Sequence, residues 1–254
     1  MKTVCVRGIE IGAGIPKIAV SLTGATEEEL LAQAAALGDL GADVAEWRMD
    51  CFSGAENGSA VGNCLRALRR ALGDTPLLAT FRTAREGGQR RLSGENYAAL
   101  CEFVIASGQA DLLDVELFSG EDMVQRLIAA AHAAALPVLL SSHDFEKTPP
   151  RAEMVSRLCR MQELGGDLLK LAVMPRSKED VVALLSATEE MAARHAERPL
   201  ITMSMGHLGA ISRVCGQFFG SAMTFGAAAE ASAPGQIDAR RLSGLLAALD
   251  RDVF

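Results

Sequence analysis

One lysine interrupts a stretch that otherwise has the composition of a buried strand. The run GGDLLKLAVMP, residues 165–175, places Lys170 among leucines. Burial disfavours the charged ammonium and lowers its pKa, and nearby arginines would lower it further. A neutral amine condenses with a ketone or aldehyde to an imine, whose protonated form is an electron sink. A buried lysine beside a base therefore indicates one of two reactions: carbon–carbon cleavage, or proton abstraction followed by elimination. The alternative is a structural lysine paired with Asp114 or Glu116.

His143 is the candidate base for this chemistry. Its ordinary pKa of about 6.5 lets an imidazole take and return a proton near neutral pH. The residue ends the predicted strand 136–144, which comes immediately before the strand of Lys170, so we expect both side chains to reach one substrate. Glu86, in the loop after the third predicted strand, could orient and polarise the ring. The alternative for His143 is a purely structural histidine.

Charged residues near the ends of five predicted strands share one face. In the run 43–50, Glu46 and Arg48 alternate with Trp47 and Met49, so one face ends in polar groups and the other is apolar. The active sites of α/β barrels lie at the carboxyl ends of the strands. We therefore expect one polar mouth to collect these side chains: Glu46, Arg48, Arg82, Asp114, Glu116, His143 and Lys170.

Barrel interiors also hold buried ion pairs, which gives a structural alternative for part of this set. Asp114 or Glu116 could simply pair with Arg48 or Arg82.

Eight β-rich runs alternate with amphipathic, alanine- and leucine-rich helical stretches. No proline- or serine-rich linker divides them, which favours one (β/α)8 TIM barrel over residues 1–254 rather than an open doubly wound sheet. Two short β-prone runs around Gly8 predict an N-terminal β-hairpin that caps the barrel floor. Thr26, followed by Glu29, predicts a capping box at the first helix. The expected strands are 17–24, 43–50, 76–83, 110–118, 136–144, 167–175, 198–206 and 221–227.

Composition excludes several classes of function. The net charge of −7 argues against a general nucleic-acid or acidic-membrane binder. The six cysteines are scattered without metal or disulfide spacing and suit a reducing compartment. The sequence shows no signal-peptide pattern and no transmembrane run, which predicts a cytoplasmic protein. It also has no P-loop and no dinucleotide fingerprint, so no nucleotide cofactor is expected.

Two further segments indicate what is bound. Arg213, in GHLGAISRVCG, is expected near the start of a helix at the mouth, where its guanidinium suits a carboxylate; a helix-surface arginine is the alternative. The small-residue loop 226–236 predicts a mobile lid, in which Ser232 and Gln236 offer neutral hydrogen bonds. An ordinary flexible loop is the alternative for this segment.

Seven motifs occur in an order and spacing typical of one enzyme family: EWRMD, TFRTAREGG, DVEL, LLSSHDFEKTP, LLKLAVMP, SMGHLGAISR and FGAAAEASAPGQI. With these motifs the chain resembles, over essentially its whole length, the type I 3-dehydroquinate dehydratases of the shikimate pathway. One departure is Ser142, where the family pattern leads us to expect asparagine. Ser142 points to the outer side of its strand, so it puts little in doubt.

The resemblance implies a reaction and a role for each site residue. Lys170 would form the imine with the C3 ketone of 3-dehydroquinate. His143, supported by Glu86, would remove a proton from C2 and protonate the departing C1 hydroxyl, which gives 3-dehydroshikimate after hydrolysis. No metal or diffusible cofactor is implied, and the family predicts a homodimer. The implied substrate-binding residues are Arg213 and Gln236 for the carboxylate, with Ser232 and Ser21 nearby, and Glu46, Arg48 and Arg82 for the ring hydroxyls.

Two other functions share the same residues. A class I aldolase or transaldolase also needs a lysine, a base and a barrel, and the family motifs decide against it. An aldolase acting on sugar phosphates should show a glycine-rich phosphate site after the seventh and eighth strands, where SMGHLG is the only candidate. A non-catalytic barrel that binds an anionic metabolite is the other reading, and the presence of both Lys170 and His143 counts against it.

Overall fold

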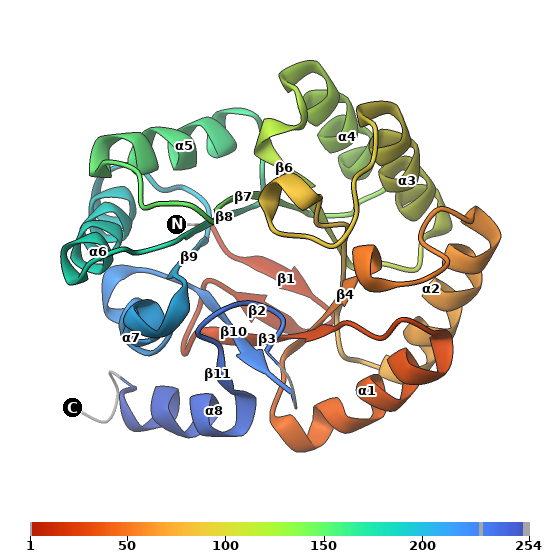
Figure 1. The fold of residues 1–254 in the computed structure, drawn as a ribbon, viewed down its shortest axis with the longest axis horizontal. Coiled ribbons are helices and arrows are strands. Elements are labelled where there is room, and N and C mark those ends of the chain that lie inside the picture. The colour runs from red at the N-terminus through yellow and green to blue at the C-terminus, as the bar shows by residue number, and fades with distance from the viewer. Residues whose placement is uncertain (1, 229–230, 251–254) are drawn as a thin grey trace.

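The eight predicted strands form a curled parallel sheet surrounded by helices, as a (β/α)8 barrel requires (Figure 1). The computed structural model describes residues 2–228 and 231–250. The sheet order is β11-β10-β3-β4-β5-β6-β7-β8-β9, in which β11 is the short strand Ile237–Asp238. An isolated bridge between Leu200 of β9 and Ser221, two residues before β10, closes the barrel. The barrel strands are β3 (Lys17–Leu22), β4 (Val44–Arg48), β5 (Leu77–Thr80), β6 (Leu112–Glu116), β7 (Val138–Asp144), β8 (Leu168–Val173), β9 (Leu200–Ser204) and β10 (Met223–Ala227).

One helix follows each barrel strand, and the ring of helices covers the outside of the sheet. Thr26 caps the first helix as predicted, because its side chain accepts from the Glu29 amide. The rest of the predicted capping box is wrong: the Glu29 carboxylate accepts from the amide of Ala25 instead of that of Thr26. The helices are α1 (Glu27–Leu40), α2 (Gly58–Leu72), α3 (Gly94–Ser107), α4 (Glu121–Ala133), α5 (Arg151–Glu163), α6 (Lys178–Arg194), α7 (Gly206–Phe219) and α8 (Ala239–Ala248).

Alternate strand residues pack into two separate cores, which confirms the predicted parity. Trp47 and Leu171 belong to the large cluster between sheet and helices, whereas Val44 and Leu168 belong to a second cluster inside the barrel. The polar residues with the inner parity therefore lie above this inner apolar layer, at the carboxyl ends of the strands.

A hairpin closes the other end of the barrel, as predicted. Strands β1 (Val4–Val6) and β2 (Ile9–Ile11) pair antiparallel around a turn with positive φ at Arg7 and Gly8. Val4, Val6 and Ile11 join the inner apolar cluster. The hairpin thus seals the floor with apolar side chains and leaves the mouth as the open end.

One short strand that the sequence did not indicate follows the predicted lid directly. The short β11 (Ile237–Asp238) pairs parallel with the carboxyl end of β10 and ties the end of the lid to the barrel. Ala229 and Glu230, in the middle of the predicted lid, lie outside the described residues.

Candidate active site

All ten residues predicted to bind or act on a substrate line one pocket at the barrel mouth. They come from the strands β3, β4, β7 and β8, from the segments that follow β5 and β10, and, for Arg213, from helix α7 after β9. The ten are Ser21, Glu46, Arg48, Arg82, Glu86, His143, Lys170, Arg213, Ser232 and Gln236.

Lys170 projects into this pocket from the middle of β8 and is only 4% exposed. Its Nζ lies 3.8 Å from Oε1 of Glu46 and 3.9 Å from the centre of the Phe225 ring. Burial lowers the pKa of Lys170, the Glu46 carboxylate opposes that effect, and Arg82 adds to it, with a net lowering. The site therefore contains an amine that loses its proton more readily than a lysine in water.

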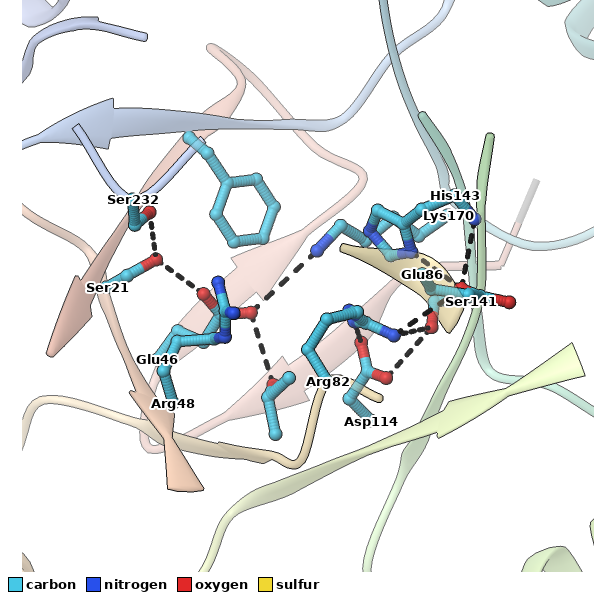
Figure 2. Close-up of polar contacts among 12 residues, drawn as sticks. Ser21, Glu46, Arg48, Arg82, Glu86, Asp114, Ser141, His143, Lys170 and Ser232 are labelled. Atoms are coloured by element: carbon cyan, nitrogen blue, oxygen red, sulfur yellow. Dashed lines mark hydrogen bonds and ion pairs between the residues drawn. The ribbon is translucent and has the colours of Figure 1, made fainter. Parts of the chain in front are cut away.

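Glu46 links Lys170 to the lid. Its Oε2 accepts from Ser21 Oγ at 2.5 Å, its Oε1 accepts from Thr80 at 3.1 Å, and Ser232 donates to Ser21 at 2.9 Å (Figure 2). Burial acts to raise the pKa of Glu46, but Lys170 and nearby arginines outweigh it and the pKa is lowered. Glu46 is therefore held as a carboxylate beside the amine.

His143 lies two residues further along β7 than the residue paired with Lys170. Ser141 of β7 is in register with Lys170, and His143 follows on the same face, so ring and amine enter the pocket side by side (Figure 2). Oε2 of Glu86 accepts from the His143 backbone N–H at 3.0 Å and lies 2.9 Å from Nδ1. With Nδ1–H donating to the carboxylate, Nε2 keeps a free lone pair and can act as a base.

Arg82 forms ion pairs with three carboxylates, of which Asp114 and Glu86 are drawn in Figure 2. Its Nη2 donates to Asp114 at 2.7 Å and its Nη1 donates to Glu116 at 3.0 Å and to Ser141 at 3.0 Å. The predicted ion pairs are thus confirmed for Arg82. The expectation that Asp114 and Glu116 join the pocket lining is wrong, because both carboxylates are turned toward Arg82 and its neighbours instead.

Arg48 has a partner that sequence reasoning missed. Asp50, which is fully buried, accepts two hydrogen bonds of 2.8 Å from the Arg48 guanidinium and one from the backbone N–H of Gln89. The motif EWRMD contains both residues, but β4 ends at Arg48 and Asp50 lies in the 3-10 turn Met49–Cys51, so the alternation along the strand gave no signal for this pair. This pair fixes the guanidinium at the edge of the pocket.

Arg213 is a buried cation without a carboxylate partner among residues 2–228 and 231–250. It is 2% exposed, its Nε has no hydrogen bond within those residues, and its terminal nitrogens contact only Met203 Sδ and the carbonyl oxygens of Phe225 and Pro234. Burial lowers its pKa to about 10. Since an unpaired buried charge is costly, this guanidinium is suited to an anionic group of a ligand.

The described part of the lid packs over the pocket. Gln236 accepts from the Ser232 backbone N–H at 2.8 Å and donates to Ser232 Oγ at 2.9 Å. Gly235 has φ of +76°, and a Cβ there would lie 2.1 Å from the carbonyl oxygen of Gly206. The loop can therefore approach the start of α7 this closely only with glycine at position 235.

Sequence reasoning also missed the apolar walls of the pocket. Met203, Met205 and Phe225 could have been found from the alternation in β9 and β10, while Phe145 lies in a loop without a periodic signal. No group of three or more His, Cys, Asp or Glu in the described ranges is placed to hold a metal ion. The arrangement joins an amine, a base and an unpaired cation around a partly apolar space.

Comparisons with known proteins point to one family. A family model described as type I 3-dehydroquinase matches residues 18–252. A 3-dehydroquinate dehydratase from Syntrophotalea carbinolica is 49% identical over 246 residues, 97% of each chain. One from Clostridioides difficile is 46% identical over 252 residues, 99% of each chain. The match to the family model spans every residue of the pocket.

A solved structure has the same fold. The 1.95 Å crystal structure of the type I 3-dehydroquinate dehydratase from Clostridium difficile, with covalent modified comenic acid, superposes with a TM-score of 0.95. It is 47% identical in sequence, and the alignment covers 98% of both chains.

Proposed function

Because the chain belongs to the type I 3-dehydroquinase family and dehydrates 3-dehydroquinate, we propose that it does so through an imine between Lys170 and the substrate ketone. One observation carries this proposal: the buried amine of Lys170 shares a pocket with His143, whose ring is oriented by Glu86. The covalent modified ligand in the Clostridium difficile relative supports covalent chemistry in this fold.

The first step uses the neutral form of Lys170. The amine attacks the C3 carbonyl carbon, a carbon–nitrogen bond forms, and one water leaves as the imine is completed. Burial favours this step because it increases the neutral fraction of the amine, as the lowered pKa of Lys170 indicates. The protonated imine then withdraws electrons from the adjacent C2.

The second step uses His143. Its Nε2 takes the proton from C2, and the electron pair moves toward the iminium nitrogen. The C1–oxygen bond then breaks while the same imidazole returns the proton to the departing hydroxyl, which leaves as water. Hydrolysis of the imine consumes one water and restores Lys170, so the net reaction removes one water from 3-dehydroquinate.

The remaining pocket residues hold the ring in place. The guanidinium of Arg213, which has no carboxylate partner among the described residues, binds the substrate carboxylate, and Gln236 and Ser232 of the lid assist it. Ser21 lies between the lid and the carboxylate of Glu46. We assign the ring hydroxyls to three further polar residues of the pocket lining: Glu46, Arg48 and Arg82.

Reductive trapping tests the imine. The enzyme is mixed with 3-dehydroquinate and borohydride, and its peptides are mapped by mass spectrometry. A reduced adduct is expected on Lys170 and absent from the exposed Lys147, which serves as the internal control. Lys170→Ala is expected to lose both the adduct and turnover. A wild-type enzyme that turns over without any adduct on Lys170 rules out the mechanism.

We further propose that the enzyme is a cytoplasmic homodimer without a metal or diffusible cofactor. The dimer follows from the family resemblance, and the cytoplasmic location is supported by cysteines that are all free in the structure. No described helix is long and apolar enough to cross a bilayer. Light scattering is expected to give about twice the chain mass of 26.8 kDa, and a mass equal to that of one chain would refute the dimer.

A further inference from the structure

We propose that Glu116, which does not line the pocket, is a positioning residue for the dehydration. It fixes the turn that carries Glu86, and it balances the charge that Arg82 presents to the pair formed by Glu86 and His143. The inference rests on the proposed function, because it takes His143 as the base.

The carboxylate of Glu116 clamps the start of that turn. Its Oε1 accepts from the Thr83 backbone N–H at 2.8 Å and its Oε2 accepts from Thr83 Oγ1 at 2.7 Å. The backbone of Glu116 is itself fixed, since its N–H donates to the hydroxyl oxygen of buried Tyr97 at 3.0 Å. Both carboxylate oxygens of this 3%-exposed residue therefore bind one threonine, while its main chain is anchored by Tyr97.

The clamp is transmitted to the base through a short turn. The Thr83 carbonyl oxygen accepts from the backbone N–H of Glu86 at 3.0 Å and from that of Gly88 at 2.9 Å. The Glu86 side chain then contacts both the backbone N–H and Nδ1 of His143. Only one 3-10 turn, Ala84–Glu86, thus separates the residue that Glu116 holds from the carboxylate that orients the ring.

Glu116 and Glu86 also share one nitrogen of Arg82. Nη1 lies 3.0 Å from Oε1 of Glu116 and 3.7 Å from Oε2 of Glu86. With Asp114 on Nη2, three carboxylates compete for one guanidinium. The two carboxylates of β6 therefore neutralise much of the positive charge of Arg82, which weakens its electrostatic effect on Glu86.

The charges around the pair determine the sign of the effect. The pKa of Glu86 is raised to about 8. Burial is the largest cause, the positive charge of Arg82 opposes this rise, and the carboxylates of Glu116 and Asp114 add to it. Burial lowers the pKa of His143, and the surrounding cations lower it further. Protonation of Glu86 or of His143 adds one positive charge to the pair. Removing a nearby negative charge therefore disfavours protonation of both groups and lowers both pKa values. The charged groups facing the pair are Arg48, Arg82, Asp114, Glu116 and Lys170.

The test is the pH dependence of kcat/KM for 3-dehydroquinate, measured on the full chain. The base must be free of its extra proton, so activity is lost on the acidic side. Glu116→Gln keeps the side-chain volume and removes one charge beside Arg82. Its acidic limb is expected to move to lower pH, because the positive charge of Arg82 then acts on Glu86 and His143 with one fewer carboxylate to oppose it.

Two matched variants separate charge from shape. Glu121→Gln makes the same charge change on an exposed residue of α4 and is expected to leave the limb in place. Thr83→Val keeps every charge but removes the Oγ1 hydrogen bond to Glu116, one of the two bonds by which Glu116 holds this residue. It is expected to lower kcat several-fold with little change in KM and no shift of the limb. An unchanged kcat in Thr83→Val overturns the clamp.

A folded Glu116→Gln enzyme with the wild-type acidic limb overturns the electrostatic role. If near-UV circular dichroism shows that this variant does not fold, Asp114→Asn takes its place, because Asp114 acts on Glu86 with the same sign. Failure of the proposed function is seen separately, as the absence of a borohydride adduct on Lys170 of the wild-type enzyme.

Discussion

At the scale of single residues, Lys170 and His143 divide the reaction into covalent capture and proton transfer. Burial lowers the pKa of both Lys170 and His143, and it raises the pKa of Glu86, the carboxyl group that orients the imidazole. Groups whose environments push their pKa values away from the ordinary range are what acid–base catalysis near neutral pH needs.

This division predicts different consequences for the two substitutions. His143→Ala leaves the amine of Lys170 intact, so borohydride is still expected to trap the imine. Turnover is expected to fall by about 10²- to 10⁴-fold, the usual contribution of a general acid–base group. Steady-state kinetics and peptide mapping on the same preparation measure both effects.

A surface histidine provides the control for that substitution. His132 lies on α4 with its side chain 42% exposed and paired to Asp167, so His132→Ala is expected to keep wild-type kcat. Near-normal turnover in His143→Ala would show that another group is the base.

At the scale of elements, the strands were predictable because a barrel strand repeats with period two. One face of β4 or β8 meets helices and must be apolar, while the other face meets the interior and changes to polar at the mouth. That alternation identified every strand carrying a predicted site residue. The direction of Arg48 and Lys170 into the pocket followed from the same rule.

The same alternation does not predict how deep in the barrel an inward-facing side chain lies or which partner it contacts. Asp114 and Glu116 share the inward parity of β6 but stop beneath the pocket, because Arg82 extends down to meet them. The bidentate bond between Asp50 and Arg48 depends on the backbone turning into a 3-10 helix after β4, which period two does not describe. Parity predicts the face of a side chain, whereas its partners depend on the loops that follow the strand.

At the scale of the whole molecule, the barrel separates stability from function. The hairpin seals the floor of the barrel, where Val4, Val6 and Ile11 belong to the inner apolar cluster. The reactive groups line the pocket at the opposite end, the mouth. In α/β barrels the carboxyl ends of the strands carry chemistry and the amino ends carry stability. The hairpin should therefore contribute to folding without contributing to turnover.

Ile11→Ala tests this separation. Ile11 is fully buried, so its truncation leaves a cavity in the floor and is expected to lower the free energy of unfolding by about 2–5 kcal/mol. Because the pocket lies at the other end of the barrel, kcat/KM at 25 °C is expected to stay at the wild-type value. Cys5→Ala, on the exposed side of the same hairpin, is the control and should change neither quantity. Urea denaturation and steady-state kinetics measure the two properties, and a loss of kcat/KM in folded Ile11→Ala would show that the floor supports the site after all.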